Sequence, residues 1–139
     1  FIGAYSADVP SADGDIVFNI SGGLMQRFAK GFALMQGGQI HDVQYYDGPS
    51  GGAAFGGNVD VVSGGALLVW LVNVGWTGGA DTFTGFTADA TPTERQLSGI
   101  DLIAALETGI STTETRDVQF TRGGSQDKGM LLISMAPSS

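Results

Sequence analysis

The segment Ala66–Val74 is the longest apolar stretch of the chain, and glycines bound it on both sides. It is too short to cross a membrane as a helix. Its β-branched residues and Trp70 favour a strand. Because polar residues do not alternate with apolar ones, both faces of this strand are expected to be covered. The sequence therefore predicts a strand at the centre of a packed sheet, with the similar segment Met130–Ala136 as its neighbour.

Glycine occupies 23 of 139 positions, roughly twice its usual share of about 7%. Many of the glycines come in pairs between apolar segments, which is typical of tight turns with positive φ. Several segments between these turns carry strand patterns. The further strands expected are 15–20, 39–46 with a bulge, 53–62, 82–87 and 115–121, while residues 88–96 are expected to form a loop.

Two segments have the spacing of apolar residues that is typical of a helix. In residues 98–107, Ser98 is a candidate N-cap, and the residues Ile100, Ile103 and Leu106 fall on one helical face. Residues 24–35 place apolar side chains at i, i+4, i+8 and i+11, namely Leu24, Phe28, Phe32 and Met35. Gly31 disfavours the second helix, so two short strands are the alternative for that segment.

These elements together predict one domain over residues 1–139. About eight short strands, glycine-rich turns and one or two short helices indicate an all-β protein, an antiparallel β-sandwich of which the jelly roll is one form. Residues 1–14 contain Pro10 and an Asp-Gly turn signal, and we expect them to form an N-terminal arm, with a short edge strand over residues 1–5 as the alternative.

The charge of the chain argues against two classes of partner. Fourteen acidic and six basic residues give a net charge of −8. Nucleic-acid binding needs a basic face, and an anionic membrane surface attracts basic segments, so neither partner is expected, nor is insertion into a membrane. Charged residues make up only 14% of the chain, against an average of about 25%. Such a low share fits a protein that covers part of its surface with neighbouring subunits.

No catalytic or metal-binding pattern is present in the sequence. The absence of cysteine excludes disulfides and thiolate ligands. The single histidine, His41, precedes Asp42, and neighbouring residues of a strand point to opposite faces, which disfavours a catalytic pair. The acidic loop 8–15 does not match the spacing of a calcium loop, and no glycine pair continues as a phosphate loop. We therefore expect a protein that is not an enzyme and holds no metal ion or cofactor.

The candidate contact residues are aromatic. Tyr45 and Tyr46 are adjacent on an expected strand, so one ring should point inward and the other outward. Trp76 follows a glycine at the end of the central strand, where an exposed ring would stack on a sugar or a partner protein. Packing in the core or at its rim is the alternative for all three side chains.

The segments Ser63–Trp70 (SGGALLVW) and Gly129–Ser134 (GMLLIS), with a threonine-rich middle between them, resemble small β-sandwich modules of tailed-phage virions. The resemblance implies a structural subunit for capsid decoration, a head spike or the tail surface. It further implies a homo-oligomer, a trimer or pentamer, bound to a major capsid or tail protein. Such a subunit would assemble in the host cytoplasm and lie on the virion surface.

Two alternatives stay open from the sequence. The first is a carbohydrate-binding β-sandwich that uses Trp76, Tyr45 or Tyr46 as a platform for a host glycan. The second is an extracellular filament subunit that exchanges strands, with the arm residues Phe1, Ile2 and Tyr5 in the donated strand.

Overall fold

The computed structural model of the chain describes residues 38–48, 54–74, 81–89, 93–97, 100–122 and 128–137. Within these ranges the protein is all-β, as the sequence predicts, and contains no helix. Accordingly, the described part holds no helix of the length and apolarity that a membrane span requires. The strands are β1 (Gly38–Gly48), β2 (Phe55–Val61), β3 (Ala66–Val74), β4 (Asp81–Thr84), β5 (Thr93–Leu97), β6 (Ile100–Thr108), β7 (Glu114–Arg122) and β8 (Lys128–Pro137).

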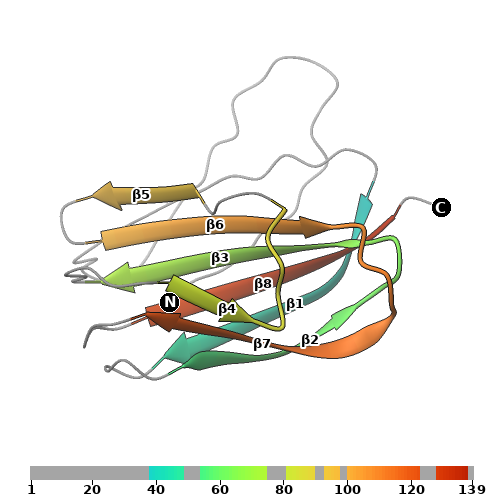
Figure 1. The fold of residues 1–139 in the computed structure, drawn as a ribbon, viewed down its shortest axis with the longest axis horizontal. Coiled ribbons are helices and arrows are strands. Elements are labelled where there is room, and N and C mark those ends of the chain that lie inside the picture. Colours follow the sequence, from blue (N-terminus) through green and yellow to red (C-terminus); the bar gives the residue numbers. More distant parts are fainter. Residues whose placement is uncertain are drawn as a thin grey trace, which may run out of the picture.

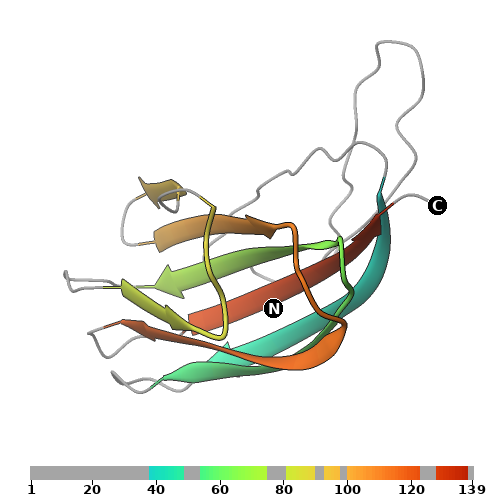
Figure 2. The same cartoon turned by 45° about the vertical axis from the view of Figure 1, so that its right-hand side comes forward.

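The described strands form two antiparallel sheets that pack face to face (Figure 1, Figure 2), which confirms the predicted β-sandwich. The larger sheet has five strands in the order β1-β8-β3-β6-β5, and the smaller has three in the order β2-β7-β4. β3 lies at the centre of the larger sheet and pairs with β8, so both predictions for the apolar segments are confirmed.

The pairings β1 with β8, β2 with β7 and β3 with β6 are three of the four pairings of a jelly roll. In that arrangement a long antiparallel hairpin is rolled into two sheets, so that the first strand pairs with the last. The fourth pairing, β4 with β5, is not formed among the described strands. Instead, β5 pairs with β6 and extends the larger sheet. The pairing of β4 with β7 in the smaller sheet agrees with the jelly-roll arrangement.

The core lies between the two sheets. Leu67, Val69 and Leu71 of β3 point into it and are fully buried, as expected for alternate residues of one strand. Val118 and Phe120 of β7 meet them from the smaller sheet, where the Phe120 ring packs against two other aromatic rings. Burial of each large apolar side chain contributes about 1.5–3 kcal/mol relative to its exposure.

The prediction of a helix over residues 98–107 is wrong, because Ile100–Thr108 forms β6. Apolar residues in this segment fit both the helical and the strand period, since Ile103 and Ala105 are buried between the sheets while Leu106 lies on the opposite face. As a strand the segment forms hydrogen-bond ladders on both sides, with β3 and with β5, and a helix would form neither.

Two boundaries also differ from the expectation. The segment expected as a loop, 88–96, contains the start of β5, whose backbone pairs with β6. The strand expected over 82–87 ends at Thr84, because Gly85 has φ +71° and leaves the sheet there.

The predicted bulge of β1 is confirmed by a register shift between Ile40 and Asp42. The predictions for residues 15–20, 24–35 and the arm 1–14 lie outside the described residues.

At one end of the sandwich, the β2–β3 turn and the β6–β7 turn are hydrogen-bonded to each other. In the turn between β2 and β3, Gly64 has φ +78°, and the Gly65 N–H donates to the Val62 carbonyl at 2.9 Å. The Gly64 N–H donates to the carbonyl of Ile110, whose own N–H donates to the Gly65 carbonyl, at 2.7 and 3.2 Å. The turns before β3 and before β7 therefore hold one another.

Gly85 and Gly109 provide a matched test of backbone constraint. Both have positive φ, but a Cβ on Gly85 would lie 1.9 Å from the Asp117 carbonyl oxygen, while nothing lies within 4 Å of one on Gly109. We expect Gly109→Ala to lower the free energy of unfolding by about 1 kcal/mol, the cost of a side chain at positive φ. Gly85→Ala adds a steric clash and is expected to cost more than about 3 kcal/mol. Urea denaturation of both variants measures the difference, and equal losses would contradict the close approach.

Candidate functional site

Tyr45 and Tyr46 point to opposite sides of β1. Tyr46 faces the smaller sheet, where its hydroxyl donates to the carbonyl of Asn58 at 2.5 Å. Its ring fills the space beside Gly57, since a Cβ there would lie 2.4 Å from the ring. Burial, followed by the charge of Asp42, raises the pKa of Tyr46 above its ordinary value. This tyrosine therefore ties β1 to β2 and is not available as an exposed platform.

Tyr45 lies on the outer face of the larger sheet, and its hydroxyl donates to the Asp47 carboxylate. Partial burial, and then the hydrogen bond and charge of Asp47, raise the pKa of Tyr45 to about 12. The hydroxyl is therefore protonated throughout the neutral range. Of the two adjacent tyrosines, this is the one whose side chain is exposed.

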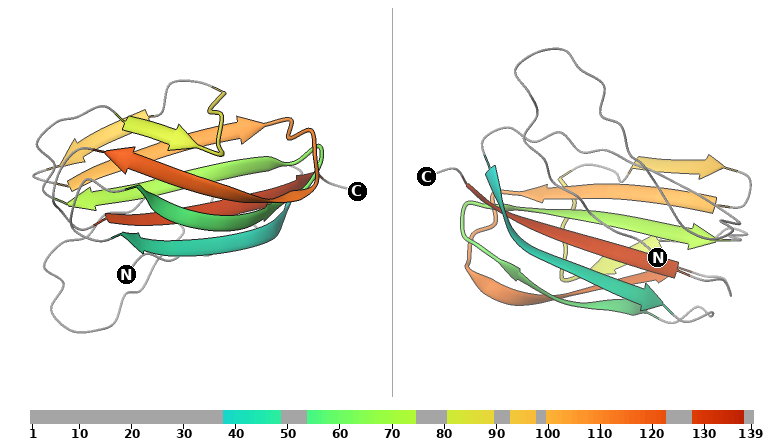
Figure 3. Two further views of the ribbon diagram at one scale, coloured as in Figure 1. Left: turned by 60° about the horizontal axis from the view of Figure 1, so that its bottom comes forward. Right: turned by 180° about the vertical axis from the view of Figure 1, so that it is seen from behind.

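The β1 patch is a row of three apolar side chains on β1, namely Ile40, Val43 and Tyr45. Their exposed fractions are 46%, 39% and 37%, respectively. Each stands directly opposite an outward residue of β8, so the three share one face. β1 is an edge strand of the sheet, and Figure 3 shows it at the margin of the sandwich.

His41 and Asp42 do not form a catalytic pair. His41 lies at the bulge and is exposed. The Asp42 carboxylate instead accepts hydrogen bonds from the Gln44 side chain and from the backbone N–H of Asp60 on β2, both at 2.9 Å. Asp42 therefore joins the two sheets, as Tyr46 does.

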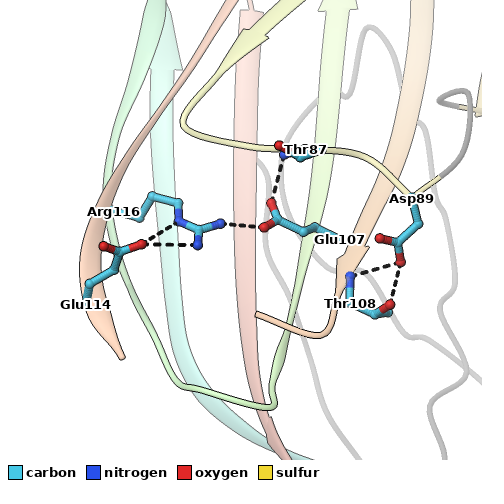
Figure 4. A network of polar contacts seen from close by, with 6 residues as sticks. All are labelled: Thr87, Asp89, Glu107, Thr108, Glu114 and Arg116. Carbon is cyan, nitrogen blue, oxygen red and sulfur yellow. Dashed lines mark hydrogen bonds and ion pairs between the residues drawn. The ribbon is translucent and has the colours of Figure 1, made fainter. Parts of the chain in front are cut away.

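A polar network on the other side of the sandwich centres on Arg116 of β7 (Figure 4). The Arg116 guanidinium donates to Glu107 of β6 at 2.7 Å and, through two nitrogens, to Glu114 at 3.1 and 3.2 Å. Burial lowers the pKa of Arg116, but hydrogen bonds and charges from both glutamates outweigh it, so the pKa lies above its usual value. Because Arg116 lies on the smaller sheet and Glu107 on the larger one, their ion pair links the two sheets.

The same network fixes the segment that follows β4. The second carboxylate oxygen of Glu107 accepts the N–H of Thr87 at 2.8 Å, and the Asp89 carboxylate accepts both the N–H and the hydroxyl of Thr108 (Figure 4). The two bonds from Thr108, the hydroxyl first, lower the pKa of Asp89. Glu107 thus joins β6, β7 and the segment 85–89 that follows β4.

Sequence reasoning missed this network because residues 98–107 were expected to form a helix. With the segment as a strand, Glu107 follows the buried Ile103 and Ala105 at alternate positions, so it faces inward. An acidic residue at an inward position needs a partner of opposite charge, and that alternation is the signal that would have found Arg116.

Trp76 and the arm residues Phe1, Ile2 and Tyr5 lie outside the described residues. Among the described side chains, no group of three or more His, Asp or Glu residues is placed to hold a metal ion. Comparison with protein-family models, curated proteins and solved structures finds no match.

The Arg116 network gives a stability prediction with an internal control. Arg116 and Glu107 are only 16% and 14% exposed, whereas Glu114 is 47% exposed. Arg116→Met leaves the Glu107 carboxylate without a counter-charge and is expected to lower the free energy of unfolding by about 2–4 kcal/mol. Glu114→Gln removes an exposed partner and is expected to cost about 1 kcal/mol or less. Equal losses in urea denaturation would show that Glu107 is not the important partner.

Proposed function

We propose that this chain is a non-enzymatic structural subunit of a bacteriophage particle, a capsid decoration protein or a surface subunit of the head or tail. It associates with itself and binds the lattice of a major capsid or tail protein at the virion surface. The strand pairings support this proposal, because the jelly roll is common among viral capsid domains. Because one fold serves many functions, the strand pairings alone do not identify this one. The evidence for a partner comes from the exposed surface.

The observation that carries the proposal is the β1 patch. An edge strand with exposed apolar side chains is a template for contact with another chain, and monomeric proteins usually protect such edges with charges or prolines. Ile40, Val43 and Tyr45 are exposed on a strand of 11 residues that contains no lysine, arginine or proline. Its two aspartates, Asp42 and Asp47, accept hydrogen bonds from within the chain, and its bulge lies next to Ile40. A neighbouring subunit that packs on this patch would remove it from water.

Light scattering over a range of concentrations tests this proposal. The wild-type chain is expected to form a trimer or pentamer. Val43→Lys places a charge in the patch and should raise the dissociation constant of the oligomer at least about tenfold. Leu106→Lys is the matched control, because Leu106 is equally exposed on the same sheet but is separated from β1 by two strands. A wild-type monomer at every concentration, or equal weakening by both variants, would contradict the proposal.

Carbohydrate binding is the second candidate, favoured by the exposed Tyr45 ring beside the Asp47 carboxylate. A ring that stacks on a sugar next to a carboxylate that accepts hydroxyl hydrogen bonds is suitable chemistry for a glycan, and jelly rolls also occur among lectin domains.

A glycan array separates the second candidate from the first. If the chain binds a glycan as a monomer, Tyr45→Ala should abolish the signal, because the stacking surface is lost. Val43→Ala removes a neighbouring apolar side chain without a ring and should leave binding nearly unchanged. No signal from the wild-type chain, or equal loss in both variants, would reject Tyr45 as a glycan platform.

A further inference from the structure

β4 ends the smaller sheet and leaves one of its edges open. On one side β4 pairs with β7, where Phe83 stands opposite Phe120 and Thr84 opposite Gln119. In a jelly roll β5 would lie on the other side, but here β5 pairs with β6 in the larger sheet. Among the strands that the structure describes, β4 therefore has a single partner. Such an edge presents backbone N–H and C=O groups to a strand of another chain.

Most of the features by which proteins protect an edge strand are missing from β4. The strand contains no lysine, arginine or proline, its only charged residue is the first, and its pairing with β7 has no register shift. Thr82 and Thr84 are exposed on the outer face. Phe83 is half-buried on the inner face, with its ring 4.9 Å from that of Phe120 and 5.3 Å from that of Phe86. Only its length of four residues limits the pairing of β4 with another strand.

The sequence of β4 is complementary to itself in one antiparallel register. Because opposed residues of an antiparallel pair share a face, a twofold axis between two copies of β4 must pass at a residue. With the axis at Phe83, the two copies of Phe83 stand opposite each other, and Thr82 of each copy stands opposite Thr84 of the other. Aromatic pairs and threonine pairs are both favourable across strands. Asp81 falls opposite Gly85, which has φ +71° and leaves the sheet, so no like charges meet.

The charge of the chain and the place of β4 both favour a second copy as the occupant. Each copy carries a net charge of −8, so two copies approach each other most easily where neither presents a charge, as along Thr82–Thr84. β4 also lies at the opposite margin of the sandwich from β1 (Figure 3, left), because β2, at the other edge of the smaller sheet, is the strand bonded to Asp42 of β1. A contact through β4 therefore does not compete with one through the β1 patch.

We propose that β4 pairs with β4 of a second copy across a twofold axis at Phe83, which joins two smaller sheets into one continuous sheet. This inference goes beyond the proposed function, because it adds a second contact to that of the β1 patch. A twofold contact uses the same surface on both copies and closes on itself. Where the β1 patch forms a trimer or pentamer, the β4 contact links these oligomers to one another. Because β4 is short, this contact is the weaker of the two and forms at the higher protein concentration.

The Val43→Lys chain tests the β4 contact alone, because the added charge weakens association through the β1 patch. Sedimentation of this chain over a range of concentrations should show an equilibrium between monomer and dimer. In the same chain, Thr82→Lys with Thr84→Lys places like charges opposite each other in the two copies and should raise the dissociation constant of the dimer at least about tenfold. Thr82→Lys with Thr84→Glu places opposite charges there and should restore the dimer. Thr112→Lys, in the exposed turn before β7, controls for added charge and should leave the dimer unchanged.

Two outcomes would overturn the β4 pairing. The first is a Val43→Lys chain that stays monomeric at every concentration, and the second is equal weakening of the dimer by the Lys/Lys and Lys/Glu pairs. If substitutions in β4 unfold the chain, hydrogen exchange of the Val43→Lys chain replaces them. The N–H groups of Thr82–Thr84 should then exchange more slowly as the protein concentration rises, and exchange that is independent of concentration would equally overturn the pairing.

Failure of this inference is distinguishable from failure of the proposed function. A Val43→Lys chain that dimerises through β4, together with a wild-type chain that forms no trimer or pentamer, would contradict the role of the β1 patch and support the β4 contact. A wild-type trimer or pentamer, together with a strictly monomeric Val43→Lys chain, would contradict the β4 contact alone.

Discussion

β3 carries large apolar side chains on both of its faces, and the smaller sheet covers one of these faces. Leu67, Val69 and Leu71 point to the smaller sheet, while Leu68 and Trp70 point away from it. Each such side chain gains about 1.5–3 kcal/mol from burial, so the packing of the smaller sheet on Leu67, Val69 and Leu71 is a main source of stability. The flanking strands β8 and β6 continue the same apolar surfaces across the centre of the sheet.

Polar contacts hold the two sheets together around this apolar interior, each at a different margin. On the β1 side, Asp42 and Tyr46 reach the backbone of β2. On the β6 side, Glu107 pairs with Arg116 of β7, and at one end the Gly64 and Ile110 turns exchange hydrogen bonds. Hydrogen bonds of this kind contribute about 1 kcal/mol each. They fix the orientation of one sheet relative to the other, whereas burial of apolar side chains drives the packing of the two sheets.

The elements that the sequence predicted correctly are those whose pattern fits one period only. β3 and β8 are mostly apolar without regular polar alternation and are too short to be buried helices. The broken alternation of Ile40 and Val43 indicated the bulge in β1. β6 could not be recognised, because its apolar residues fit two periods and the choice depends on ladders to β3 and β5. The error carried over to the polar network, since Glu107 on a helix would have no reason to face Arg116. The opposite orientations of Tyr45 and Tyr46 followed directly from strand geometry, while the partner of each hydroxyl depended on the fold.

Gly38 at the start of β1 lies beside Pro137 at the end of β8, so the chain enters and leaves the described sandwich at one corner. A tension applied between these two positions would pull two antiparallel neighbours apart from one end, loading their backbone hydrogen bonds one after another. Such unzipping offers little mechanical resistance compared with shearing, in which all bonds of a ladder share the load. A domain of this design is suited to bear load through its faces and edges, and β1 would be the first strand to peel away if the load passed through the chain itself.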